Sequence, residues 1–292
     1  LYTYALASLF TPVTTTPPTD PKPPTPTPAV TTNHARYQLG VNVLQFTDYG
    51  FQALRNGCRF VMFMDNGGGA ITAAREYPDA LIMYRRYHSN KLSPDSMFKL
   101  LDIEWETCPG NFIPTFSNEN DTQNPNNLPE YFPWFKEVAG KVWERNPGVR
   151  CAFGSWGHGN PNWVDQGVVK YWRETVAPWL NQNAHRVVLD LHMYTKGKRR
   201  PTHPVAESPI IGMEWFETRH QFAYQNGLSK SVRHVGGEGG VEAKAGGFTW
   251  AGYTNQQFKE WAFDVVNGER ECDPPPLGVA LYHLGDHVGW RG

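Results

Sequence analysis

Eight short runs rich in β-branched, aromatic and other apolar residues, spread over residues 37–292, constrain the fold of this chain most strongly. Stretches with helical spacing of apolar residues separate them, which favours strand–helix units and a parallel sheet. A span of about 256 residues is close to the size typical of a closed barrel of eight such units. The predicted strands are 38–45, 59–64, 80–86, 112–118, 149–155, 187–194, 232–238 and 278–284. The sequence therefore predicts an α/β fold, a single-domain (β/α)8 TIM barrel.

Helix boundary signals agree with this alternation. Ser93 followed by Pro94 is typical of a helix start, with a cap and a proline at the first helical position. A second helix is predicted over 129–145 and ends at Asn146. Pro114 falls inside the predicted fourth strand, where a strand paired on both sides disfavours proline. We therefore expect Pro114 at the start of that strand or at a bulge.

The N-terminal part has a different composition. Residues 1–10 are apolar but short, and we interpret them as the remnant of an export signal or anchor, or as a boundary. Residues 11–36 are rich in proline and threonine, which predicts a disordered, extended linker ahead of the barrel domain at 37–292. Such linkers tether exported domains, so we expect an extracellular or cell-surface location. A tail without any partner is the alternative.

Charge and cysteine content exclude several classes of function. The net charge is −1, which gives no concentrated basic surface for nucleic acid. No run reaches the roughly 18 apolar residues of a membrane span, so we expect no membrane insertion of the barrel. The four cysteines have neither a CxxC pair nor zinc spacing, and their disulfide pairing stays open. We expect neither a metal nor a cofactor, and the sequence does not indicate an oligomeric state.

The side chains that could bind or react follow the predicted strands. In a (β/α)8 barrel, functional residues lie at the C-terminal ends of the strands and in the loops after them. The candidates at these positions are Arg85, Arg86, His88, Asn118, Glu119, Trp156, His158, Asn160, His192, Tyr194, Glu238 and Trp290. Of the two adjacent arginines, we expect only one to reach the site.

Glu119 and Glu238 stand out because they follow the fourth and seventh strands, which lie on opposite sides of a barrel mouth. Cleavage of a glycosidic bond needs one protonated carboxyl group and one ionised carboxylate. Neighbouring groups can separate the pKa values of two such acids. This pair therefore predicts hydrolysis of a poly- or oligosaccharide, with a carbohydrate as the partner.

The ordered set Asn118-Glu119, His192-x-Tyr194 and Glu238 resembles the clan of retaining (β/α)8 glycoside hydrolases that includes cellulases, mannanases and β-xylosidases. The resemblance implies that Glu119 is the acid/base and Glu238 the nucleophile. It also implies that Asn118 binds the sugar 2-hydroxyl and that Tyr194 contacts the nucleophile.

Two alternatives remain open at this point. The clan usually has proline after the acid/base, whereas Asn120 follows Glu119 here, and the usual strand-8 tryptophan has no clear match. A carbohydrate-binding or structural barrel without turnover is therefore the second hypothesis. The third rests on Asp102-Ile103-Glu104-Trp105-Glu106, which is similar to the acidic motif of chitinase-like barrels and would make Glu106 the acid.

Overall fold

The computed structural model describes residues 39–44, 47–88, 92–118, 127–156, 161–196, 220–242 and 273–284. Their strands follow the order β6-β5-β4-β3-β2-β1-β9-β8, and β8 pairs back with β6. Eight parallel strands thus close into a barrel, and the predicted (β/α)8 TIM fold is confirmed. The strands are β1 (Leu39–Leu44), β2 (Phe60–Met64), β3 (Leu81–Arg85), β4 (Phe112–Thr115), β5 (Cys151–Trp156), β6 (Val187–Leu191), β8 (Arg233–Glu242) and β9 (Val279–Leu284).

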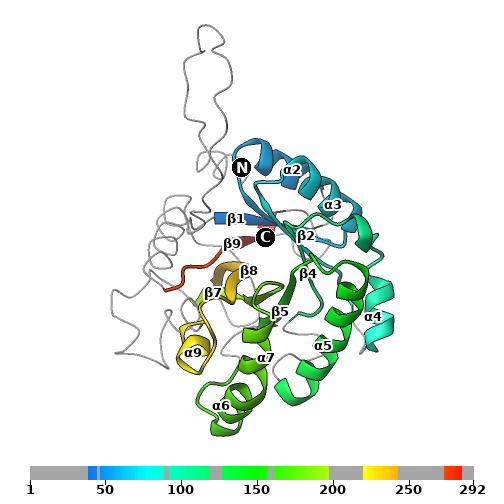
Figure 1. Cartoon of the computed structure of the whole chain (residues 1–292). Coiled ribbons are helices and arrows are strands. Elements are labelled where there is room, and N and C mark those ends of the chain that lie inside the picture. Colours follow the sequence, from blue (N-terminus) through cyan, green and yellow to red (C-terminus); the bar gives the residue numbers. More distant parts are fainter. Residues whose placement is uncertain are drawn as a thin grey trace, which may run out of the picture.

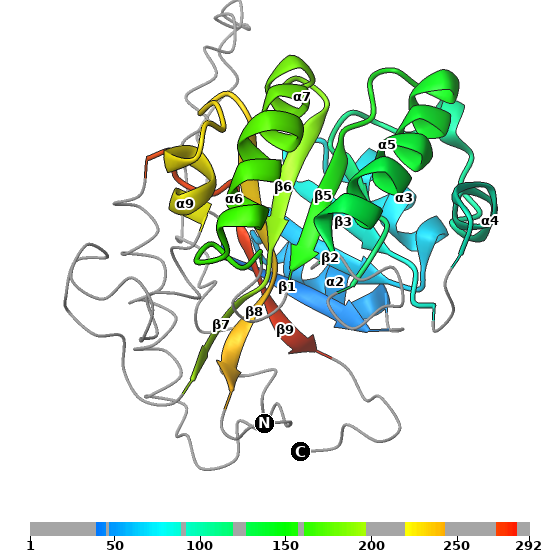
Figure 2. The same cartoon turned by 90° about the horizontal axis from the view of Figure 1, so that it is seen from below.

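A further strand, β7 (Met193–Lys196), continues the line of β6 after His192 and pairs with the C-terminal half of β8. In Figure 2 the arrows of β7, β8 and β9 point to the same end of the barrel. Parallel strands place all their carboxyl ends at one mouth, and that mouth is where (β/α)8 barrels carry their sites.

The helices form an outer layer around the strands (Figure 1). Ser93 caps α4 (Pro94–Leu100), since its Oγ accepts the Ser96 N–H at 3.2 Å, and α5 (Leu128–Arg145) ends at Arg145 with Asn146 as its C-cap, as the sequence predicted. The described helical segments are α2 (Thr47–Arg55), α3 (Gly67–Glu76), α4 (Pro94–Leu100), η2 (Trp105–Thr107), α5 (Leu128–Arg145), α6 (Gln166–Tyr171), η3 (Trp172–Val176), α7 (Ala177–Gln182) and α9 (His220–Gln225).

Two hydrophobic layers hold the barrel together. On β2, Phe60 and Met62 point into the barrel, whereas Val61 and Phe63 point outward to the helices. The same alternation on other strands fills the barrel interior with apolar side chains toward the amino ends of the strands. Pro114 is the third residue of β4 and pairs in regular register with Tyr84, so the expected strand start or bulge is wrong. It is accommodated because β4 pairs with β3 along its length but with β5 only at Thr115, so the missing N–H of Pro114 interrupts little pairing.

Several predictions fall outside the residues that the structure describes. These are the assignments for residues 1–10 and 11–36 and the domain boundary at residue 37. Cys58, Cys108 and Cys151 are buried and carry thiols, and burial raises the pKa of Cys58 to about 11 and that of Cys108 to about 12. Across the described segments, no helix has the length and apolar character needed to cross a bilayer, and no three potential metal ligands cluster.

A buried histidine in the layer between the barrel and the helices makes the stability of the protein depend on pH. His234 on β8 stacks on His220 of α9 with ring centroids 4.0 Å apart, and its Nδ1 lies 3.0 Å from the Tyr224 hydroxyl. That hydroxyl donates to the Val232 carbonyl, so it accepts the hydrogen bond from His234. Burial, together with the nearby charges of His220 and Arg233, lowers the pKa of His234 well below its usual value.

The free energy of unfolding should therefore fall in mild acid. The unfolded chain binds a proton at His234 with a pKa of about 6.5, whereas the folded chain resists it. The contribution of His234 to the free energy of unfolding is fully present above the pKa of the unfolded chain. It declines as the pH falls toward the folded pKa, by up to about 1.4 kcal/mol per pH unit. Urea unfolding between pH 7 and 5 should show a shallower decline for His234→Asn than for wild type. The exposed-histidine variant His185→Gln should keep the wild-type slope, and an unchanged slope in His234→Asn would contradict the assignment.

Candidate active site at the carboxyl end of the barrel

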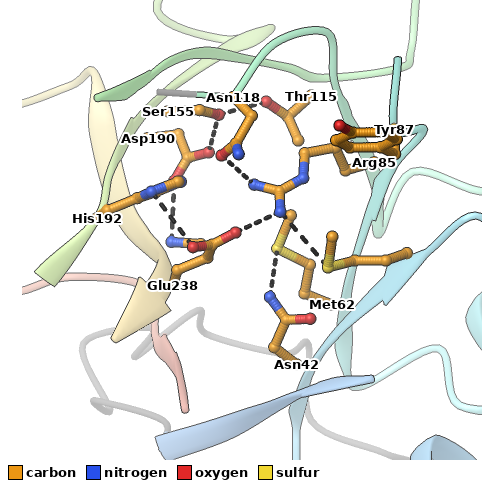
Figure 3. Close-up of polar contacts among 12 residues, drawn as sticks. Asn42, Met62, Arg85, Tyr87, Thr115, Asn118, Ser155, Asp190, His192 and Glu238 are labelled. Atoms are coloured by element: carbon orange, nitrogen blue, oxygen red, sulfur yellow. Dashed lines mark hydrogen bonds and ion pairs between the residues drawn. The ribbon is translucent and has the colours of Figure 1, made fainter. Parts of the chain in front are cut away.

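A layer of polar side chains replaces the apolar filling at the carboxyl end of the barrel (Figure 3). Its members come from six strands or from the residues directly after them, and they include two carboxylates and one guanidinium group. We call it the polar cluster, and it consists of Asn42, Arg85, Thr115, Asn118, Ser155, Asp190, His192 and Glu238.

Arg85 and Glu238 form an ion pair in the middle of the polar cluster, from Arg85 Nη2 to Glu238 Oε1. Their side chains are only 3% and 4% exposed. Arg85 Nη1 also donates to Asn118 Oδ1 at 2.7 Å, and Nη2 lies 3.4 Å from Met64 Sδ. Removing two charges from water is costly, and their mutual attraction and hydrogen bonds offset that cost. The pair therefore holds the Glu238 carboxylate in a fixed place.

His192 lies on the other side of this carboxylate. Its Nδ1 is 3.4 Å from Glu238 Oε2, and its backbone N–H donates to the Trp156 carbonyl at 3.0 Å. The His192 side chain is buried. Glu238 is thus flanked by Arg85 from β3 and by His192 directly after β6.

A bulge in β8 turns Glu238 into the barrel. Val235 points inward, so regular alternation would send Glu238 outward to the helices. Between Gly236 and Gly239 the pairing with β9 shifts by one residue. Such a shift moves the next side chain to the opposite face of the sheet. Gly237 permits this because a Cβ at that position would lie 2.5 Å from an Asp190 carboxylate oxygen.

A second bulge shapes β5 at the same level of the barrel. The register with β6 shifts between Gly154 and Trp156, and Ser155 adopts a left-handed φ of 58°, which is strained for a residue with a side chain. The shift turns the Ser155 hydroxyl inward, where it donates to Asp190 Oδ2 at 2.5 Å and lies 2.7 Å from Thr115 Oγ1.

The same bulge corrects the prediction for Trp156, which we expected to bind substrate. Its side chain is fully buried in the outer core, against Phe153 and Trp172 at centroid distances of 5.1 and 6.2 Å. The extra residue in β5 sends the indole toward the helices instead of the mouth. Trp156 is therefore a packing residue.

The two adjacent arginines lie in different surroundings, and Arg85 is buried in the barrel. Arg86 is 40% exposed and donates to the Asp65 carbonyl at 3.2 Å, so it belongs to the outer rim. His88 is buried with Nε2 3.4 Å from the Phe116 carbonyl, close to the end of β4. The structure brings Arg85, Asn118, His192 and Glu238 together and leaves Arg86 outside this group.

The side chains of five other candidates lie outside what the structure describes. Glu119, His158, Asn160 and Trp290 lie outside the described residues, and for Tyr194 only the β7 backbone, paired with Gly240, is described. Asn118 nevertheless shows the position of the chain one residue before Glu119. Through Arg85, residue 118 is two hydrogen-bonded contacts away from Glu238.

The structure does not support the hypothesis that Glu106 is catalytic. Glu106 lies in η2, ahead of β4, and is 57% exposed. It pairs at 3.0 Å with Arg145, which ends α5 ahead of β5. Both residues therefore lie near the amino ends of the strands, at the opposite end of the barrel from the polar cluster.

Four members of the polar cluster were not anticipated from the sequence, namely Asp190, Ser155, Thr115 and Asn42. Asp190 lies two positions before His192 in a strand, and residues two apart share a face, so this spacing could have revealed it. Asn42 is a polar residue within an apolar run, and its Nδ2 lies 3.5 Å from Met62 Sδ. Ser155 could not be found this way because its orientation depends on the bulge.

Comparisons with known proteins add a likeness in fold. No family model matches the chain, and no curated protein matches it either. Among solved structures, it is similar to the Clostridial cellulose synthase subunit Z from Clostridioides difficile, with a TM-score of 0.53 and 11% sequence identity. The match covers 86% of this chain and 92% of that chain. At this identity the likeness shows the barrel fold.

Proposed function

We propose that this chain is a retaining glycoside hydrolase that cleaves O-glycosidic bonds of a poly- or oligosaccharide, with Glu238 as nucleophile and Glu119 as acid/base. One observation carries the proposal. The buried Glu238 carboxylate, held by Arg85 and flanked by His192, stands at the mouth of the barrel and is linked through Arg85 to Asn118, the residue before Glu119.

In the first step, the Glu119 carboxyl group gives its proton to the glycosidic oxygen while a Glu238 oxygen attacks the anomeric carbon. The bond to the leaving sugar breaks and a covalent glycosyl–enzyme ester forms. In the second step, Glu119 takes a proton from water, and the oxygen of that water displaces Glu238 from the anomeric carbon. The two inversions give net retention, which needs carboxyl groups about 5–5.5 Å apart.

The neighbours of Glu238 suit the role of a nucleophile. Arg85 compensates the negative charge of the carboxylate in a buried environment, and it fixes the side chain through a contact that does not involve the oxygen facing His192. Positioning a reacting group in this way removes much of the entropic part of the barrier. The resemblance assigns the sugar 2-hydroxyl to Asn118, which the structure places beside Arg85.

Two further observations support a carbohydrate as the substrate. The matching solved structure is named as a subunit of a cellulose synthase. Tyr87 follows the Arg85-Arg86 pair, is 60% exposed, and has its backbone N–H held by Asp65 Oδ1 at 2.7 Å. An exposed aromatic ring on a tethered stretch of backbone near the mouth offers a face on which a sugar ring can stack. The proline- and threonine-rich residues 11–36 support an extracellular or surface-tethered location.

A substrate panel tests the proposal. The protein should hydrolyse at least one member of a set of aryl β-glycosides, polysaccharides and peptidoglycan, and proton NMR of the first product should show the anomeric configuration of the substrate. Inversion would contradict the nucleophilic role of Glu238. Binding of polysaccharide without turnover by wild type, Glu119→Gln and Glu238→Gln alike would support the alternative, a carbohydrate-binding barrel without catalysis.

A further inference from the structure

Asp190 is a carboxylate that the proposed reaction does not use, although it is among the most deeply buried polar residues described. It is fully buried at the end of β6, between β5 on one side and β8 on the other. Its Oδ2 accepts the Ser155 hydroxyl at 2.5 Å, and its Oδ1 accepts the backbone N–H of Gly237 at 2.8 Å. One side chain thus joins three adjacent strands, β5, β6 and β8.

The contacts of Asp190 coincide with both bulges of the barrel. Ser155 is the extra residue of the β5 bulge, and Gly237 lies inside the β8 bulge, directly before Glu238. Because the single Ser155 hydroxyl proton goes to Asp190, Thr115 donates to Ser155 Oγ. The chain Thr115–Ser155–Asp190–Gly237 therefore runs across β4, β5, β6 and β8, and hydrogen bonds in such a chain strengthen one another.

Two costs of this arrangement argue that it serves a purpose. Ser155 keeps a left-handed backbone, which costs of order 1 kcal/mol or more for a residue with a side chain. A fully buried carboxylate must also give up its hydration. Within the described residues, Asp190 accepts hydrogen bonds from a hydroxyl and from a backbone amide, and both donors lie where a strand departs from regular pairing.

We propose that Asp190 is the positioning residue of this site, and that it fixes the β8 bulge so that Glu238 points at the substrate. The inference rests on the proposed function for its effect on turnover. Its structural part does not, because the bond from Gly237 to Asp190 exists whatever the barrel binds. Asp190 touches neither substrate nor reacting atoms in this scheme and acts through Gly237.

The test compares Asp190→Ala with the conservative Asp190→Asn. A displacement of about 1 Å at a reacting group can cost about 10²-fold in rate, so Asp190→Ala should lose about that factor in kcat with KM changed less than about threefold. An asparagine can still accept from Gly237 through its oxygen and donate to Ser155 Oγ, so Asp190→Asn should recover at least about a tenth of the wild-type kcat. Loss of stability in Asp190→Ala with kcat unchanged would overturn the proposal.

A second variant guards against a failure to fold. Ser155→Gly removes the hydroxyl donor and relieves the left-handed strain at once, so its melting temperature should stay close to wild type while kcat falls about tenfold. Asp102→Gly is the matched control, because Asp102 is exposed, follows α4 and has a φ of 49°. It relieves the same kind of backbone strain away from the polar cluster, so it should keep the wild-type kcat. A Ser155→Gly variant with wild-type kcat would overturn the proposal.

Amide hydrogen exchange at Gly237 separates this inference from the proposed function. Exchange at Gly237 should be at least about tenfold faster in Asp190→Ala than in wild type, while amides of β2 keep their protection. A wild-type protein that turns over no substrate, combined with faster Gly237 exchange, would reject the hydrolase and keep the positioning role. Unchanged exchange at Gly237 would reject the positioning role even where the hydrolase is active.

Discussion

Glu238→Ala should lower kcat for the best substrate by about 10⁴-fold or more, the scale on which loss of a nucleophile usually acts. The glycosyl–enzyme ester cannot form without the carboxylate, and Arg85 keeps its charge beside the vacated space. Steady-state rates on an aryl glycoside, with circular dichroism to verify folding, measure the effect. Glu174→Ala is the control, because Glu174 is an exposed glutamate on η3, and it should keep the wild-type kcat.

Azide should restore turnover in Glu238→Ala and reveal which glutamate is which. The anion enters the vacated space beside Arg85 and attacks the anomeric carbon while Glu119 protonates the leaving group. This single displacement gives a glycosyl azide of inverted configuration. In Glu119→Ala, with an aryl leaving group that needs no acid, Glu238 still forms the ester and azide displaces it, which gives retained configuration. The reverse pairing of products would exchange the two roles.

The fold was predictable because each barrel strand is a short apolar run between turn and helix signals. All eight predicted strands occur, and the bounds of β2 and β5 differ from the prediction by one or two residues. The pattern of apolar residues is local information, and it survives into the structure because the parallel strands are buried on both faces.

The orientation of the site residues was harder to predict, because it depends on two bulges. Regular alternation from inward Ala152 sends Ser155 out and Trp156 in, and from inward Val235 it sends Glu238 out. The bulges reverse all three. Sequence reasoning singled out Glu238 from its chemistry and its place at the seventh strand, but it misplaced Trp156 and missed Ser155, because nothing local in a sequence reports a register shift.

Asp190 was missed for a different reason. The spacing to His192 could have placed it in the polar cluster, but its two partners could not be inferred before β5 and β8 were known to flank β6. These partners are 35 residues before and 47 residues after it in the chain. The sequence likewise did not decide which of Arg85 and Arg86 reaches the site. Strand register decides it, because Arg85 is the last residue of β3 and Arg86 begins the loop.

Arg85→Met should destabilise the protein by about 3–5 kcal/mol, because it leaves the Glu238 carboxylate buried without a compensating charge. Methionine has a similar length and suits the position, since Met62, Met64 and Met83 are buried nearby in the same part of the barrel. Arg86→Met is the matched control one residue away. Arg86 is 40% exposed, and removing an exposed charge should change the free energy of unfolding by less than about 1 kcal/mol. Urea unfolding at pH 7 measures both.

The double variant Arg85→Met/Glu238→Gln decides whether the loss arises from an unpaired charge. Glutamine keeps the shape of Glu238 without its charge, so the double variant buries no ion, and it should be more stable than Arg85→Met alone. The losses in free energy of unfolding of the two single variants, added together, should therefore exceed the loss in the double variant. The difference should be about 2 kcal/mol or more, as expected for residues in direct contact. Additive losses would mean that Arg85 stabilises the barrel by packing alone. In that case Arg85 would give Glu238 no electrostatic support, and the inference that Arg85 holds the nucleophile in place by its charge would be wrong.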